Sequence, residues 1–261
     1  MGFGLASCLV SRVSCLVSLV LLLATSYLIL LLMKTIGLLG GMSWESSIEY
    51  ERIINTEVRR RLGGVHSADL LIRSYDFDDI EALQLEGEWD QAGALLATDA
   101  ARLEAAGADL IVLATNTMHK VAPQIESAIT IPFLHIADAT ADAVHQAGID
   151  SVALLGTRYT MEQDFYRGRL ADRGLTVMVP DAAERSLIHD VIFGELVQGR
   201  VEAASKQRFL EIIDGLYEQG AEGVIAGCTE IELLVTPDDL DRPYFPTTRI
   251  HAVAAVDAAL V

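Results

Sequence analysis

The chain has 261 residues, of which 19 are Lys or Arg and 37 are Asp or Glu, so its formal net charge is −18. This acidity argues against nucleic acid as the main partner, because phosphate binding requires a basic surface. The many aliphatic residues exclude a disordered or collagen-like chain, and three cysteines are too few for a disulfide scaffold.

The first 33 residues differ in composition from the rest of the chain. Between Val13 and Met33 there are 21 consecutive uncharged and mostly apolar residues, which as a helix would span about 30 Å, enough to cross a bilayer. Two interpretations stay open: a true membrane anchor, or upstream sequence translated from an early start codon. A signal peptide fits less well, because Arg12 is the only charge of the segment and a cleavage site near Ala24 would leave an apolar stub.

From residue 34 onward, short apolar runs alternate with amphipathic segments. The continuous apolar runs indicate strands that are buried on both faces, hence an α/β fold with mostly parallel sheets flanked by helices. The predicted strands are Lys34–Leu39, Asp69–Tyr75, Asp109–Ala114, Phe133–Ile136, Ser151–Leu155, Thr176–Val179 and Gly223–Ala226. The predicted helices are Trp44–Leu62, Asp90–Ala106, Asp138–Ala147, Met161–Arg173, Leu187–Gln198, Ala203–Glu218 and Glu230–Leu234.

An internal repeat relates the two halves of this pattern. Residues 34–41 (KTIGLLGG) correspond to 150–157 (DSVALLGT), and residues 107–117 (GADLIVLATNT) to 220–230 (GAEGVIAGCTE), at offsets of 116 and 113 residues. The repeat predicts two lobes related by a pseudo-twofold axis. We expect residues 34–131 plus about 238–261 in the first lobe and 132–237 in the second, with 1–33 as an extension.

The repeat pairs Thr115 with Cys228, each directly after a predicted buried strand and before a helix. Ligands of open α/β sheets bind at the carboxyl ends of the strands, so the two side chains are expected to face one cleft between the lobes. The amides that follow them, at 116–117 and 229–230, open helices, and such amides bind carboxylates and lower the pKa of a nearby thiol.

The segments GLLGGMSWES (37–46), TNTMHK (115–120), GTRYTMEQDFY (156–166) and GCTE (227–230) resemble the aspartate/glutamate racemase family. Within it they are similar to the branch of enterobacterial broad-specificity amino-acid and aspartate/glutamate racemases. The resemblance begins at about Met33 and continues to the C-terminus. It implies a two-lobe fold, substrates among small α-amino acids such as aspartate or glutamate, no cofactor, and a homodimer.

The resemblance also implies the chemistry. Most of the family uses two cysteines, one per lobe: one removes the α-proton as a thiolate, and the other protonates the opposite face of the carbanion. A thiol suits this task because its reference pKa near 8.5 can be tuned to physiological pH. Donors must neutralise the substrate carboxylate as charge develops, and Asn116, Thr117 and Thr229 occupy the matching positions.

Thr115 departs from the pattern, because most relatives have cysteine there. A threonine hydroxyl is scarcely ionised near neutral pH, although the branch that this chain resembles also carries threonine. We therefore expect Cys228 to be the competent base and the two enantiomers to react at unequal rates.

Further substrate-binding positions follow from the resemblance. Met42 lies in the first strand–turn, where relatives contact substrate, and Gln84 matches a position that in some relatives holds a basic residue. A neutral amide there would weaken the preference for an acidic side chain. Thr160 opens a helix of the second lobe with Thr157, and either residue could bind a carboxylate or cap the helix. Glu230 completes the predicted set.

Other functions stay open. Sister families on the same scaffold are hydantoin racemase, maleate isomerase and arylmalonate decarboxylase, the last of which needs a single cysteine. A non-catalytic amino-acid sensor tethered by residues 13–33 is a further alternative. A reactive Cys228 favours the cytoplasm, with membrane association only if the anchor is real. His119 and His135 show no metal-ligand spacing, so we interpret them as structural, and we expect no metal site.

Overall fold

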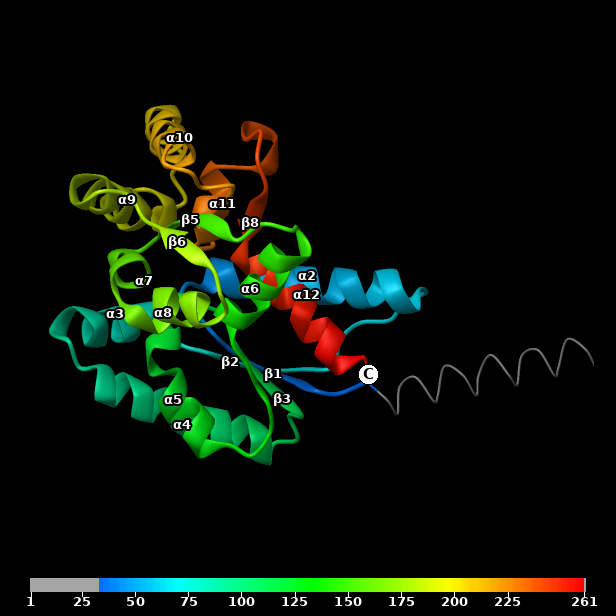
Figure 1. Cartoon of the computed structure of the whole chain (residues 1–261). Coiled ribbons are helices and arrows are strands. Elements are labelled where there is room, and N and C mark those ends of the chain that lie inside the picture. Colours follow the sequence, from blue (N-terminus) through cyan, green and yellow to red (C-terminus); the bar gives the residue numbers. More distant parts are fainter. Residues whose placement is uncertain (1–32, 261) are drawn as a thin grey trace, which may run out of the picture.

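The computed structural model describes residues 33–260 (Figure 1). The predicted extension therefore lies outside the described residues, apart from Met33. Within the described part, no helix is both long and apolar enough to cross a membrane.

Two four-stranded parallel sheets form the framework, as the sequence pattern predicts. The first has the order β2-β1-β3-β4 and the second β6-β5-β7-β8. The two orders are the same after the repeat is taken into account, which confirms the pseudo-symmetric relation of the lobes. The strands are β1 (Ile36–Gly40), β2 (Leu70–Ser74), β3 (Leu110–Leu113), β4 (Phe133–Leu134), β5 (Ser151–Gly156), β6 (Thr176–Met178), β7 (Gly223–Gly227) and β8 (Tyr244–Pro246).

Helices cover both faces of each sheet (Figure 1). Their bounds are α2 (Trp44–Leu62), α3 (Phe77–Glu86), α4 (Trp89–Ala105), α5 (Ala122–Ala128), α6 (Ile136–Gln146), α7 (Arg158–Glu162), α8 (Asp164–Asp172), α9 (Ala182–Gly194), α10 (Ala203–Glu218), α11 (Ile231–Leu234) and α12 (Thr247–Ala259). Short 3₁₀ turns are η1 (Thr117–Val121), η2 (Leu196–Gln198) and η3 (Pro237–Asp239). Successive strand residues point to opposite faces: in β1, Leu39 packs against α3 and α4, whereas Leu38 packs against α2 and α12.

The lobes exchange one helix each. Helix α6 follows β4 of the first sheet but packs on the second, against Val152 and Leu154. Helix α12 follows β8 of the second sheet but packs on the first, against Ile36 and Leu38. The predicted division at 131 and 237 differs from this pairing, because β4 belongs to the first sheet and β8 to the second. We therefore propose lobe boundaries near residues 135 and 246.

Several elements differ from the sequence expectations. Helices α3, α5 and α12 and strand β8 were not predicted. The helix expected over 161–173 is two helices, because Gln163 adopts an extended backbone (φ −99°, ψ 149°) between α7 and α8. Helix α9 begins five residues before the predicted start, where Asp181 and Glu184 form a reciprocal capping box.

Three buried imidazoles lie together where the lobes meet, with ring centroids 4.5 Å apart for His119 and His135 and 5.8 Å apart for His119 and His251. As predicted for His119 and His135, backbone groups satisfy them: His119 Nε2 accepts from the Ile136 amide, and His135 Nδ1 accepts from the Ala137 amide. Burial lowers the pKa of His135 to about 3 and that of His251 to about 4, and it holds the pKa of His119 well below its ordinary value.

This histidine cluster predicts a marked loss of stability on mild acidification. The unfolded chain binds protons below the ordinary pKa of about 6.5, whereas the folded cluster does not, so stability is complete above pH 6.5 and falls below it. Between pH 7 and pH 5, each histidine lowers the free energy of unfolding by roughly 2 kcal/mol. The Glu232 carboxyl acts in the opposite sense. Burial raises its pKa to about 7, so the folded chain binds this proton more readily than the unfolded chain, which restores about 2 kcal/mol of the free energy of unfolding at pH 5.

We therefore expect the free energy of unfolding, measured by urea titration, to be about 4 kcal/mol lower at pH 5 than at pH 7. In Glu232→Gln, which removes the offsetting carboxyl, the difference should widen to about 6 kcal/mol. Equal stability at the two pH values would show that the imidazoles take up protons in the folded state.

Candidate active site

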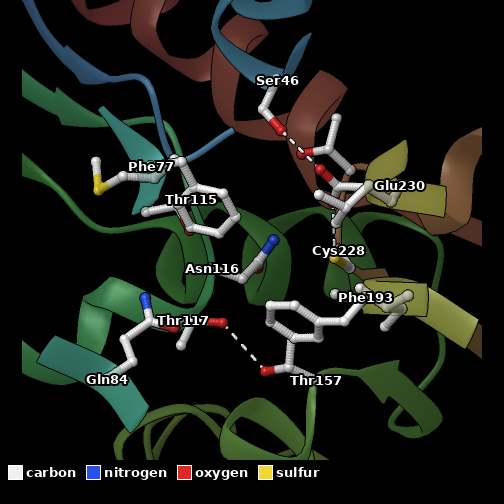
Figure 2. A pocket seen from close by; sticks show the side chains of 15 residues that line it. Ser46, Phe77, Gln84, Thr115, Asn116, Thr117, Thr157, Phe193, Cys228 and Glu230 are labelled. Carbon is white, nitrogen blue, oxygen red and sulfur yellow. Dashed lines mark hydrogen bonds between the residues drawn. The ribbon is translucent and has the colours of Figure 1, made fainter. Parts of the chain in front are cut away.

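Strands β3 and β7 end at one place between the lobes, and the polar segments that follow them form a pocket. The turn after β1 and helices α2 and α3 of the first lobe complete its lining, together with the start of α7, helix α9 and η2 of the second (Figure 2). The lining residues are Met42, Ser46, Phe77, Gln84, Thr115, Asn116, Thr117, Thr157, Ile192, Phe193, Val197, Gly227, Cys228, Thr229 and Glu230. The cavity of about 30 Å³ holds one or two water molecules, so an amino acid enters only when lining groups move.

The pocket brings together eight of the nine predicted site residues. These are Met42, Gln84, Thr115, Asn116, Thr117, Cys228, Thr229 and Glu230. The ninth, Thr160, does not line it. Thr160 is fully buried at the start of α7, and its amide donates to Thr157 Oγ1 at 3.3 Å. Thr157 is therefore the helix cap and also the residue that reaches the pocket, which corrects the assignment of Thr160 to substrate binding.

The Cys228 thiol has a carboxylate partner. Its Sγ donates to Glu230 Oε2 at 2.8 Å. Burial raises the pKa of the Cys228 thiol well above its ordinary value, and the Glu230 charge and this hydrogen bond raise it further. The resting group is thus a thiol, and the atom placed to take its proton is Glu230 Oε2.

Two serines of the first lobe hold the other oxygen of that carboxylate. Ser43 Oγ donates to Glu230 Oε1 at 2.9 Å. Ser46 Oγ donates to the same atom at 3.4 Å, as Figure 2 shows. The preceding turn requires glycine at position 41, where φ is +84° and a Cβ atom would lie 2.3 Å from the Tyr75 amide nitrogen. The turn after β1 thereby fixes the orientation of a carboxylate in the opposite lobe.

Thr115 is held through its backbone. His119 Nδ1 lies 2.7 Å from the Thr115 carbonyl oxygen, and because His119 Nε2 accepts from the Ile136 amide, Nδ1 is the nitrogen that donates. Within residues 33–260 the Thr115 hydroxyl has no hydrogen-bond partner. Figure 2 shows Thr115 on the side of the pocket away from Cys228, with Asn116 between them.

Asn116 offers an acceptor to the pocket. Thr247 Oγ1 donates to the Ala226 carbonyl at 2.8 Å, so it accepts from Asn116 Nδ2 at 3.0 Å, which fixes the amide orientation. The buried Oδ1 atom of Asn116 has no partner among the described residues. An ammonium group bound here would satisfy it.

Sequence reasoning missed several lining side chains, above all Phe77 and Phe193, whose rings point into the space among the polar groups (Figure 2). Phe77 is the first residue of the unpredicted helix α3. An aspartate N-cap, Asp76, precedes it and accepts from the Asp78 amide, and this cap was a readable signal for the helix. No signal pointed Phe193 toward the pocket, because an apolar residue on a buried helix is ordinarily core. Within residues 33–260 no cluster of three or more His, Cys, Asp or Glu side chains could hold a metal ion.

Comparison with known proteins identifies the family. A family model described as Asp/Glu/hydantoin racemase matches residues 39–255. The chain belongs to this family. Its fold is similar to the crystal structure of a candidate Asp/Glu racemase from Yersinia pestis, with 52% identity, a TM-score of 0.84, and coverage of 88% of this chain and 100% of that one.

Two further members of the racemase family agree. An aspartate racemase homologue from Pyrococcus horikoshii OT3 is 34% identical with a TM-score of 0.76, covering 87% of this chain and 99% of that one. The broad specificity amino-acid racemase RacX from Bacillus subtilis is 25% identical over 164 residues, which is 62% of this chain and 69% of RacX. The resemblance found in the sequence is therefore confirmed at the level of family and fold.

Proposed function

We propose that this member of the Asp/Glu/hydantoin racemase family is a cofactor-independent racemase of small α-amino acids. Cys228 acts on one face of the substrate α-carbon and Thr115 on the other. The observation that carries the proposal is the Cys228 thiol, hydrogen-bonded to Glu230, in one pocket with the residue at the equivalent strand end of the other lobe.

The first step begins at the thiol. The Cys228 proton moves to Glu230 Oε2, and the thiolate takes the α-proton, so the Cα–H bond breaks and an S–H bond forms. The electron pair left on Cα is delocalised into the substrate carboxylate. Asn116, Thr117 and Thr229 line the pocket and can donate to that carboxylate as its charge increases.

Return of a proton completes the reaction. Delivery from the Thr115 side gives the opposite enantiomer, whereas return from Cys228 restores the original one. A threonine hydroxyl is a much weaker acid than a thiol, so it gives its proton to the carbanion more slowly. Because it is scarcely ionised near neutral pH, it also removes an α-proton only slowly. Homodimer formation stays a prediction from the resemblance.

Exchange of the α-proton with solvent tests the proposal. In D2O, the purified chain should catalyse deuterium incorporation at the α-carbon of at least one amino acid, which NMR measures. The Cys228→Ala variant should not catalyse this exchange. Aspartate, glutamate and an uncharged amino acid should be offered as both enantiomers. Binding of one of these without exchange would favour a non-catalytic sensor, and carbon dioxide release from an arylmalonate without exchange would favour a decarboxylase.

A further inference from the structure

The first turn of helix α12 lies against the polar segments that follow both strand ends. Its first two residues, Thr247 and Thr248, are fully buried, and neither has a role in the reaction proposed above. The helix follows β8 of the second sheet but packs on the first, beside α2 and α6 (Figure 1). Its beginning therefore lies where residues of the two lobes meet.

The Thr247 hydroxyl joins the two halves of the site. Its Oγ1 donates to the Ala226 carbonyl at 2.8 Å, two residues before Cys228. The same oxygen accepts from Asn116 Nδ2 at 3.0 Å, and Asn116 directly follows Thr115. One side chain thus connects strand β7 of the second sheet with the segment that follows β3 of the first.

This arrangement permits only one orientation of the Asn116 amide. A hydroxyl has a single proton, and the Ala226 carbonyl binds that of Thr247, so Thr247 can only accept from Asn116. The amide nitrogen must therefore face Thr247, and Oδ1 is the atom left for the pocket. This buried oxygen has no partner among the described residues, as expected of an acceptor that a ligand satisfies.

Two further contacts hold the turn in place. Thr248 Oγ1 lies 2.9 Å from Thr229 Oγ1, and the Thr248 amide donates to Glu232 Oε1 at 3.1 Å. Both partners belong to the segment that follows Cys228. A shift of the turn along the pocket would break both contacts, so the Thr247 hydroxyl is fixed relative to this segment.

The equivalent helix of the other lobe shows that the fold does not require these hydroxyl groups. Helix α6 is exchanged between the lobes in the same way and begins with two apolar residues, Ile136 and Ala137. The Ile136 amide donates to His119 at 3.2 Å. This contact is equivalent to that of Thr248 with Glu232, because His119 and Glu232 are separated by the repeat offset of 113 residues. The backbone is thus held alike in both lobes, and only α12 carries hydroxyl groups on its first two residues.

We propose, on the basis of the proposed racemase function, that Thr247 is a positioning residue whose hydroxyl orients Asn116 so that Oδ1 receives the α-ammonium group of the substrate. Without that hydroxyl the amide can turn, and its NH2 group then faces the ammonium group. A hydrogen bond to a charged group contributes about 10- to 100-fold in affinity. Since the ammonium group is bound before and during proton removal, loss of this bond raises KM and leaves kcat nearly unchanged.

Two substitutions at position 247 separate the hydroxyl from the shape of the side chain. Thr247→Val keeps the shape and removes the hydroxyl, whereas Thr247→Ser keeps the hydroxyl. For α-proton exchange of an amino acid by the full chain in D2O, we expect Thr247→Val to raise KM at least about 10-fold, with kcat within about threefold of the native value. Thr247→Ser should keep KM within about threefold of the native value. An unchanged KM in Thr247→Val would overturn the proposal.

Thr140→Val is the matched control. Thr140 is also fully buried, on α6, and its hydroxyl donates to the Ile136 carbonyl at 2.8 Å rather than to a residue of the site. Loss of a buried hydroxyl should lower the free energy of unfolding in both variants, as urea titration measures, but KM should rise only in Thr247→Val. An equal rise in Thr140→Val would assign the effect to packing and overturn the proposal.

A double-mutant cycle tests whether Thr247 acts through Asn116. In Asn116→Ala the amide is absent, so the addition of Thr247→Val should change KM by less than about threefold. A further rise of about 10-fold in the double variant would show that Thr247 acts on another group, which would overturn the proposal.

A measurement on the side chain itself distinguishes failure of this proposal from failure of the racemase function. If no amino acid exchanges its α-proton, the racemase function fails, but NMR of an isotope-labelled chain still detects the side-chain amide of Asn116. Its hydrogen bond to Thr247 should protect an amide proton from exchange with D2O. Thr247→Val should accelerate this exchange at least about 10-fold, and Thr140→Val should not. Equal exchange in Thr247→Val and the native chain would overturn the proposal.

Discussion

The Glu230→Gln variant is expected to exchange α-protons about 100-fold more slowly than the native chain at pH 7, and to recover as the pH rises. In the native chain the thiol proton moves only 2.8 Å, from Cys228 Sγ to Glu230 Oε2, and the pair keeps one proton and one negative charge throughout. Glutamine cannot take that proton, so the thiolate must form by loss of a proton to solvent. Loss of a positioned proton acceptor of this kind costs about 100-fold in rate.

The direction of the pH dependence follows from the same contact. The Glu230 charge raises the pKa of the Cys228 thiol, so its removal lowers that pKa toward the ordinary value. Exchange by Glu230→Gln should therefore increase about tenfold per pH unit up to at least pH 9. The native chain should not show this steep rise, because Glu230 accepts the proton at neutral pH.

Glu232→Gln provides the matched control. Glu232 lies two residues further along the chain, and its Oε1 accepts from the Thr248 amide at 3.1 Å rather than from the thiol. Its exchange rate at pH 7 should stay within about threefold of the native rate. If Glu230→Gln equals the native rate at pH 7, the carboxylate takes no proton from Cys228.

The repeat and the strand ends were readable from the sequence because parallel strands buried on both faces leave continuous apolar runs. Thr115 and Cys228 follow two such runs, and the structure brings both to one pocket. The end of a strand is a position along the chain, so local sequence specifies it. The same reasoning located the amides at 116–117 and 229–230, whereas the resemblance to the family assigned the side chains of Asn116, Thr117, Thr229 and Glu230 to the site.

What failed depends on packing between distant segments. Helix α12 buries small residues such as Ala252 and Ala255 against the first sheet, although it follows a strand of the second. No local sequence pattern predicts such an exchange of helices between lobes. Thr157 and Thr160 both lie at the start of α7, and the packing of this helix between the lobes decides which of the two side chains reaches the pocket. Ser43, which lies 187 positions before Glu230, holds the Glu230 carboxylate in place. The orientation that makes Glu230 a partner of the thiol could therefore not be inferred from a four-residue motif.

Thr115→Ala is expected to separate two reactions that the native site combines, proton exchange and inversion. Free enantiomers have equal free energies, so kcat/KM for racemisation is the same in both directions, and unequal reactivity of the two faces cannot show there. The unequal reactivity of the two faces is measurable instead as α-proton exchange with retention of configuration. The enantiomer whose α-proton faces Cys228 loses it to the thiolate, the thiol exchanges with D2O, and deuterium returns to the same face.

In the native chain, this enantiomer should take up deuterium with retention at least about 10-fold faster than it inverts, because inversion waits for Thr115. Thr115→Ala should lower the rate of inversion at least about 10-fold further, while exchange with retention persists. Thr115→Cys should raise the rate of inversion by about 10- to 100-fold, because a thiol donates and recovers a proton near neutral pH. NMR of the α-position together with chiral chromatography measures both reactions in one sample. Inversion by Thr115→Ala at the native rate would show that another group protonates that face. Since the Thr115 hydroxyl has no hydrogen-bond partner within residues 33–260, a solvent molecule in the pocket would then be the proton donor to test.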